Sequence, residues 1–321
     1  MNQRRPFERA EIDHVRCGQG PPSVPELQVA LCVERNTRRQ VAMKRILAEA
    51  AQDPSRRARF VEEGQVTAQL QHPNIVPVYE LDRDAHGTIY FTMKPVRGRS
   101  LGEILLAVKE GKEAHSLGDL LGVFLKVCDG VAFAHSRGVV HRDLKPANLM
   151  VGDFGEVLVM DWGLAKIVGR EDIRADDLVT SDRAESTPEL TLDGTAMGTP
   201  AYMPPEQANG ELDKIDHRSD IYSLGAILYE LLTLEKPVEG ATPLVVLANA
   251  AHGTIVPPEQ RTPGRAIPRE LSAIAMQCLH KLRSRRYQSV TELQRDITLY
   301  LEGRSVSAAP DTFAQALVKL V

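Results

Sequence analysis

Two short triplets near the middle of the chain each combine a carboxylate, an aromatic ring and a glycine. They are Asp153-Phe154-Gly155 and Asp161-Trp162-Gly163. The carboxylate of such a triplet can hold a magnesium ion against the phosphates of a nucleotide. At most one of the two triplets can do this here, so the elements around them must decide which.

The segments upstream of the triplets predict a strand-rich region with one helix. Residues 26–47 are apolar or alternating on both sides of a polar turn, as in a pair of strands. Asp53 and Pro54 suit the cap and first turn of a helix, and Pro73 ends its apolar pattern. Residues 74–94 predict two further strands around a polar turn.

Beyond a linker at residues 94–98, apolar helical segments dominate. Residues 116–138 and 219–233 each indicate a buried helix, and further helices are expected in residues 271–302. Residues 139–163 between them predict a strand, a loop and a hairpin. The sequence therefore predicts an α+β fold with a small β-rich lobe, containing one main helix, and a larger α-helical lobe.

Composition sets wide bounds on function. The 321 residues carry a net charge of -4, so no basic excess indicates nucleic acid as a partner. The four cysteines lack the short spacings of zinc sites or disulfide frameworks, which favours a reduced, cytoplasmic compartment. No apolar run is long enough to predict a membrane span, and the N-terminus lacks the apolar core of a signal peptide.

The segment HRDLKPANLM, residues 141–150, matches the catalytic-loop pattern H-R-D-L-x-x-x-N. With this loop the chain resembles the eukaryotic-like (Hanks-type) serine/threonine protein kinases of bacteria, over roughly residues 13–303. The resemblance implies a two-lobed protein-kinase fold with short flanking segments. The predicted parts are an N-terminal extension (1–12), the kinase domain (13–303) with its N-lobe (13–93), hinge (94–98) and C-lobe (99–303), and a C-terminal tail (304–321).

The resemblance implies roles for three polar residues of this loop. Asp143 is expected to orient the attacking hydroxyl and accept its proton, and Asn148 to help hold a second metal ion. Lys145 is expected to neutralise the transferring phosphoryl group. A lysine there is typical of the serine/threonine branch, so the implied reaction passes phosphate from ATP, with Mg²⁺ or Mn²⁺, to serine or threonine of a protein substrate.

The same register decides between the two triplets. In the family the metal-binding aspartate follows the loop asparagine by thirteen residues, and 148 + 13 = 161 selects Asp161. The segments NLMV and EVLVM predict a hairpin, and GDFGE between them fills its turn. Asp153 would then lie at the far end of the hairpin, Phe154 would be a turn aromatic, and Asp161 would lie beside Asn148.

Other positions match the family's ATP site. Lys44 in VAMK would contact the α- and β-phosphates, and Glu63, nineteen residues later, would hold Lys44 in place. The remaining positions expected to contact ATP are Val29, Ala42, the back-pocket gate Met93, and the hinge residues Lys94 and Val96.

The resemblance also implies structural and regulatory residues. Glu206 would pair with Arg286, and Asp220 would tie the catalytic loop to a buried helix. Arg142, before the catalytic aspartate, is typical of control by phosphorylation of the activation loop. Thr191 and Thr195 are the candidate phosphorylation sites, which a kinase dimer could modify in trans. Thr199 is instead expected to contact Asp143 and Lys145.

The glycine-rich loop departs from the family pattern. Counting back from Lys44, the glycine positions hold Pro22, Val24 and Leu27, whose side chains or missing N–H weaken contact with phosphates. An alternative register uses Gly18 and Gly20 but needs about four extra residues before the lysine. Two hypotheses therefore stand: an active kinase with a weakened phosphate clamp, and a pseudokinase that acts as a docking module with weakened ATP binding.

Overall fold

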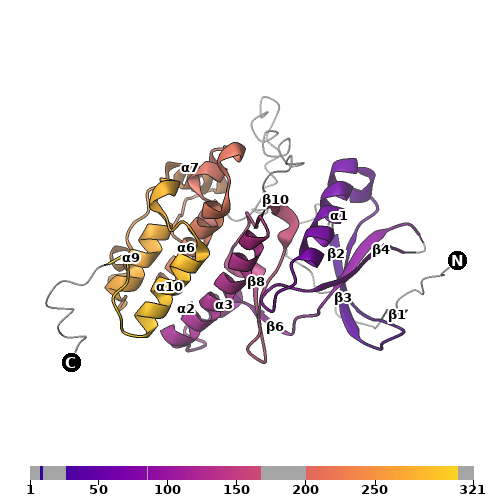
Figure 1. The fold of residues 1–321 in the computed structure, drawn as a ribbon, viewed down its shortest axis with the longest axis horizontal. Helices are drawn as coiled ribbons and strands as arrows, with labels where there is room; N and C mark the ends of the chain where they lie inside the picture. The colour runs from indigo at the N-terminus through magenta and orange to yellow at the C-terminus, as the bar shows by residue number, and fades with distance from the viewer. Residues whose placement is uncertain (1–7, 10–26, 85, 168–199, 310–321) are drawn as a thin grey trace.

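The computed structural model describes residues 8–9, 27–84, 86–167 and 200–309, and Figure 1 shows them as two adjoining lobes, one rich in strands and one helical. The predicted two-lobed α+β arrangement is thus confirmed. Several predicted positions lie outside the described residues. These are Gly18, Gly20, Pro22 and Val24 of the glycine-rich loop, and Thr191, Thr195 and Thr199.

A five-stranded antiparallel sheet forms the first lobe, in the order β1-β2-β3-β5-β4. Its strands are β1 (Glu8–Arg9), β2 (Leu27–Val33), β3 (Gln40–Ile46), β4 (Val78–Arg83) and β5 (Ile89–Met93). Helix α1 (Pro54–Gln69) packs beside the sheet after the short 3-10 turn η1 (Ala50–Gln52). The shared core of this lobe consists of Ile46, Ala50, Phe60, Ile89 and Phe91.

Local sequence explains where α1 begins and how closely it packs. The carboxylate of Asp53 accepts a hydrogen bond from the backbone N–H of Ser55 at 2.8 Å, and Pro54 occupies the first turn. A β-carbon at Gly64 would lie 3.3 Å from side-chain atoms of both Leu81 and Phe91. The glycine therefore lets the helix approach the sheet closely.

The second lobe is built around helix α6, which is buried along nearly its whole length and contacts α3 and α9. Its α-helices are α2 (Leu101–Lys109), α3 (Leu117–Ser136), α5 (Pro205–Ala208), α6 (His217–Thr233), α7 (Pro243–His252), α8 (Pro258–Arg261), α9 (Arg269–Cys278) and α10 (Val290–Leu301). Its 3-10 turns are η2 (Pro146–Asn148), η3 (Trp162–Leu164), η4 (Pro200–Tyr202), η5 (Leu212–Lys214) and η6 (Arg283–Arg285). None of the helices in the described ranges has the length and apolar character needed to cross a membrane.

Short strands lie where the lobes meet. Strands β6 (Gly98–Ser100), β8 (Leu149–Gly152) and β9 (Val157–Val159) form one antiparallel sheet, and β7 (Val139–Val140) pairs with β10 (Lys166–Ile167). The predicted hairpin is therefore present as β8 and β9. Phe154 in its turn is 94% exposed, which confirms that it is a turn aromatic.

Residues 304–309, in the predicted C-terminal tail, pack on α10. The carboxylate of Asp296 accepts hydrogen bonds from the N–H and hydroxyl of Ser307 at 3.0 and 2.7 Å and from the N–H of Ala308 at 3.1 Å. Val306 is only 2% exposed. These contacts attach the end of the described chain to the helical lobe.

Candidate active site

The polar residues of the catalytic loop converge on one carboxylate. The loop runs from β7 to η2, and the Nζ atom of Lys145 lies 2.7 Å from Oδ2 of Asp143. The side-chain amide of Asn148 donates to Oδ2 of Asp143 at 3.1 Å and to its backbone oxygen at 2.9 Å. Within the described residues Oδ1 of Asp143 has no hydrogen-bond partner, so this oxygen remains for a ligand.

Asp220, on the buried helix α6, binds the backbone of the catalytic loop. Its carboxylate accepts hydrogen bonds from the backbone N–H groups of His141 and Arg142 at 2.8 and 2.9 Å. His135 on α3 contacts the same carboxylate at 2.7 Å. Burial opposes ionisation of Asp220, but the hydrogen bond to His135 and the nearby His141 hold its pKa below the ordinary value.

This support also fixes an unusual backbone. Arg142 has a φ of 70°, in the left-handed region that side chains other than glycine rarely adopt. Its N–H is held by Asp220, and its carbonyl oxygen accepts a hydrogen bond from the side-chain amide of Gln207 at 3.1 Å. The contacts on both sides of Arg142 offset the conformational cost.

The second polar cluster joins both lobes. Lys44 lies on β3 and its Nζ is 2.6 Å from Oε1 of Glu63 on α1. The same Nζ lies 3.6 Å from Oδ1 of Asp161, which follows β9. A lysine of the sheet, a glutamate of the helix and an aspartate of the second lobe are thus brought together, as the sequence predicts.

The hairpin geometry separates the two triplets. The N–H of Met160 donates to the backbone oxygen of Asn148 at 2.8 Å, which places Asp161 next to the catalytic loop. At the other end of the hairpin, the N–H of Asp153 donates to the carbonyl of Arg97 at 3.1 Å. The predicted position of Asp161 beside Asn148 agrees with this arrangement.

Nearby basic side chains favour the ionised form of Asp161. Its backbone adopts the left-handed conformation, with a φ of 59°, and its side chain is 48% exposed. Desolvation opposes the negative charge, but Lys44, His141 and Lys145 nearby lower the pKa of Asp161 overall. The carboxylate is therefore charged at neutral pH and open to a cation.

The oxygen donors present fit a hard divalent cation. Both side-chain hydrogen bonds of Asn148 use its amide nitrogen, so its amide oxygen has no partner among the described residues. The carboxylate of Asp161 is partly exposed and can also accept a ligand. No group of three His, Cys, Asp or Glu side chains in the described chain forms a metal site alone. A Mg²⁺ ion, which keeps water and phosphate ligands, suits such a partial donor set.

Trp162 fills the pocket behind the site. The side chain is 1% exposed and its ring lies 4.5 Å from the ring of His141, centroid to centroid, at 55°. Its indole N–H is buried without a hydrogen-bond partner among the described residues. The large ring is accommodated, but the unpaired N–H costs about 1–3 kcal/mol.

The strands and the hinge place the other predicted nucleotide contacts. In the β2–β3 pair Val29 lies opposite Lys44, and Ala42 pairs with Met93 at the end of β5. The N–H of Lys94 donates to the carbonyl of Pro77 at 3.1 Å. In the hinge, the Lys94 Nζ also lies 3.1 Å from Glu156. The backbone of Val96 has no hydrogen-bond partner within the described residues.

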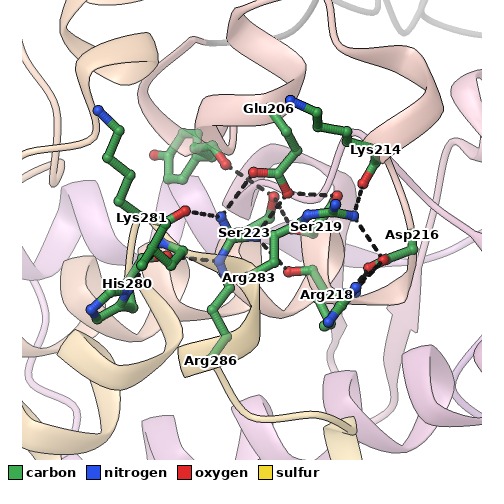
Figure 2. A network of polar contacts seen from close by, with 12 residues as sticks. Glu206, Lys214, Asp216, Arg218, Ser219, Ser223, His280, Lys281, Arg283 and Arg286 are labelled. Carbon is green, nitrogen blue, oxygen red and sulfur yellow. Dashed lines mark hydrogen bonds and ion pairs between the residues drawn. The ribbon is translucent and has the colours of Figure 1, made fainter.

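Figure 2 shows the pair formed by Glu206 on α5 and Arg286 beyond η6. Two guanidinium nitrogens lie 2.8 Å from the two carboxylate oxygens, and Ser219 also donates to Glu206 at 2.8 Å. Arg286 further donates to the carbonyl oxygens of His280 and Arg218 at 2.8 and 2.9 Å. Both side chains are buried, so the pair is structural and joins α5, α6 and the segment after α9.

Sequence reasoning missed His135 and Gln207, which contact the loop through Asp220 and Arg142. His135 lies six residues before His141 at the end of a predicted helix, and Gln207 directly follows Glu206. Neither belongs to the H-R-D-L-x-x-x-N pattern of residues 141–148. Their roles follow from the folded contacts alone.

Comparison with known proteins adds independent findings. The family model for the protein kinase domain matches residues 17–296. The chain is 41% identical over 288 residues to serine/threonine-protein kinase PknD of Protochlamydia amoebophila, covering 87% of this chain and 29% of that protein. PknD of Chlamydia pneumoniae is 36% identical over 283 residues, and that of Chlamydia trachomatis serovar D is 35% identical over 288, each with 86% of this chain and 30% of the relative covered. The chain thus spans about 30% of the length of these relatives.

Proposed function

This chain belongs to the protein kinase domain family, and we propose that it transfers the γ-phosphate of ATP to serine or threonine hydroxyls of proteins. The observation that carries the proposal is the convergence of the Asp143–Lys145 pair with the Lys44–Glu63–Asp161 cluster. A decayed kinase commonly lacks one of these residues, whereas this chain retains them all. The name of these relatives, serine/threonine-protein kinase, also supports the choice of acceptor.

Asp143 is proposed as the group that receives the acceptor's proton. Its Oδ2 is occupied by Lys145 and Asn148, which among the described residues leaves Oδ1 for the hydroxyl of the substrate. Lys145, held 2.7 Å from this carboxylate, would place its positive charge beside the phosphoryl group in transfer. The loop thus combines proton acceptance with charge neutralisation.

Lys44, Glu63, Asn148 and Asp161 are proposed to hold the nucleotide and its metal ion. Glu63 fixes Lys44 toward the α- and β-phosphates, and Val29, Ala42, Met93, Lys94 and Val96 would surround the adenine. Mg²⁺ or Mn²⁺ bound through Asn148 and Asp161 would neutralise the phosphate oxygens. The amide oxygen of Asn148, which has no partner in the described part of the chain, and the lowered pKa of Asp161 support this assignment.

Regulation by phosphorylation is a further part of the proposal. Arg142 precedes the catalytic aspartate, and Thr191 and Thr195 are the proposed modified residues, modified in trans within a kinase dimer. Thr199 is proposed to contact Asp143 and Lys145 rather than to be modified. We also propose a cytoplasmic location with no nucleic-acid partner, since Cys128 and Cys278 are free, buried thiols and the net charge is -4.

A pseudokinase that acts by docking a partner is the second candidate, and it is favoured by Pro22, Val24 and Leu27 in place of loop glycines. Transfer of labelled phosphate from ATP to the protein itself and to a generic serine/threonine substrate separates the two. The kinase proposal expects transfer with Mg²⁺ or Mn²⁺ that Asp143→Asn removes. Equal silence of wild type and variant contradicts it, and thermal-shift titration with ATP then shows whether nucleotide binding survives.

A further inference from the structure

The chain turns back along helix α10 after the helix ends. Residues 304–309, here termed the strap, lie against α10, and Ser307 and Ala308 contact Asp296 near the middle of that helix. Val306 forms a β-bridge with Ala309 and is the only buried residue of the strap. The docking of the strap on the helical lobe therefore depends largely on polar contacts.

These polar contacts converge on one buried carboxylate. Asp296 is 2% exposed, and among the described residues it accepts four side-chain hydrogen bonds. Three of them come from Ser307 and Ala308 of the strap, and the fourth, at 2.7 Å, comes from the hydroxyl of Tyr287. Burial opposes ionisation of Asp296, but these hydrogen bonds hold its pKa below the ordinary value. The strap therefore supplies most of the donors that stabilise this buried charge.

Tyr287 connects Asp296 to the structural pair shown in Figure 2. It is 2% exposed and directly follows Arg286, so the backbone that places one side chain also places the other. Arg286 binds both carboxylate oxygens of Glu206 at 2.8 Å. Gln207, the next residue, donates to the carbonyl oxygen of Arg142 in the catalytic loop. Every step from the strap to this loop is therefore a hydrogen bond or a pair of consecutive residues.

Release of the strap would leave the carboxylate of Asp296 with too few donors. Without Ser307 and Ala308, it would keep only the hydroxyl of Tyr287 among the described residues. A buried ionised group in this condition is strongly disfavoured, so water must enter or the side chain must move. Either response disturbs Tyr287 and the backbone that places Arg286. The docked and the released strap thus correspond to two different environments of the Glu206–Arg286 pair.

We propose that the strap is a conformational switch. Docked on Asp296, it stabilises the Glu206–Arg286 pair and the catalytic loop that this pair supports; released, it loosens the pair and slows phosphoryl transfer. An interaction that competes for the strap would thereby reduce transfer from a distance. The effect on transfer rests on the proposed kinase function, whereas the effect on the Glu206–Arg286 pair does not.

Hydrogen exchange in the full chain tests the link between the strap and the pair. The double variant Val306→Gly with Ser307→Asp removes the buried side chain of the strap and places a second carboxylate against Asp296. Thr298→Asp is the control, since it adds the same charge at an exposed position of α10. Mass spectrometry should show exchange about fivefold or more faster in residues 204–209 and 279–288 of the double variant, but not of the control.

Unchanged exchange of those two segments in the double variant overturns the proposal, because a strap that this change cannot release, or whose release has no effect there, is not a switch. Ser307→Ala removes a single hydrogen-bond donor and guards against loss of the fold. It should give a smaller increase in exchange at the same segments. An increase confined to the strap itself in Ser307→Ala and in the double variant contradicts the link.

Steady-state transfer tests the second half of the proposal and separates it from the kinase function. The double variant should lower kcat by about fivefold or more, while Thr298→Asp stays close to wild type. Faster exchange at the pair with an unchanged kcat overturns control of transfer by the strap. If wild type itself transfers no phosphate, faster exchange in the double variant still supports the link to the Glu206–Arg286 pair, and only the kinase function fails.

Discussion

At the scale of single residues, a few short polar contacts define the proposed chemistry. The spacing from Asn148 to Asp161 could be read from the sequence because a motif register does not depend on the fold. The left-handed backbone of Arg142 and Asp161 could not be predicted, since it is stabilised by contacts made only in the folded chain. His135 was missed for the same reason, because only folding brings α3 and α6 together around Asp220.

Asp220→Asn should destabilise the catalytic loop, although the asparagine side chain fills the same space as the aspartate. The amide keeps the shape but loses the charge that two backbone N–H groups and His135 stabilise. We expect the free energy of unfolding to fall by about 2–3 kcal/mol and kcat to fall while the KM for ATP changes little. Urea unfolding and steady-state kinetics measure these effects, and a variant as stable and active as wild type would contradict the role of Asp220.

The pH dependence of this effect has a defined sign. The folded-state pKa of Asp220 is lowered, so its charge stabilises the fold above the unfolded pKa of about 3.9 and less as pH falls through the folded value. The stability difference between wild type and Asp220→Asn should therefore be constant from neutral pH to about pH 5 and shrink below about pH 4. A difference that grows on acidification would contradict the lowered pKa.

At the scale of elements, local patterns predicted the long elements well. The strand pair in residues 26–47 appears as β2 and β3, and the helix capped by Asp53 appears as α1. Helices α2 and α7 were not predicted. Helix α2 carries a detectable signal, the reciprocal capping box of Ser100 and Glu103, whereas α7 buries only Ala250 and has little amphipathic pattern.

Gly98 is required where β6 meets β8. Its φ is 146°, and a β-carbon there would lie 2.1 Å from the carbonyl oxygen of Val151. Gly98→Ala should therefore lower the free energy of unfolding by more than the matched change Gly155→Ala at the hairpin turn. Gly155 has a φ of 79° but no atom within 4 Å of an added β-carbon, so only about 1–2 kcal/mol of backbone strain is expected. Equal losses on thermal or urea unfolding would contradict the close packing at Gly98.

The Glu206–Arg286 pair should be the strongest tie between α5, α6 and the segment after α9. Arg286→Ala leaves a buried carboxylate without its partner, so we expect a loss of about 3–5 kcal/mol in the free energy of unfolding. The double variant Glu206→Gln with Arg286→Met should recover part of this loss, because it removes the charge as well. A loss below about 1 kcal/mol for Arg286→Ala would show that the pair contributes little.

At the scale of the whole molecule, the proposed reaction depends on two lobes that contribute different halves of the site. Lys44 and Glu63 come from the strand-rich lobe, and Asp143, Asn148 and Asp161 come from the helical lobe. The lobes and their order followed from the change in sequence pattern near residues 94–98. The buried core of the helical lobe could be predicted only as apolar helices, because the sequence does not specify which helices contact α6.

The central claim is that this site transfers phosphate rather than only binding nucleotide. The most direct measurement pairs the rate of phosphoryl transfer with the affinity for ATP in wild type and Asp143→Asn. Because Asp143 is proposed to act on the acceptor hydroxyl, we expect Asp143→Asn to reduce the transfer rate at saturating ATP by about 100-fold or more. The affinity for ATP should stay close to that of wild type. Wild-type protein that binds ATP but transfers phosphate no faster than Asp143→Asn would contradict the account.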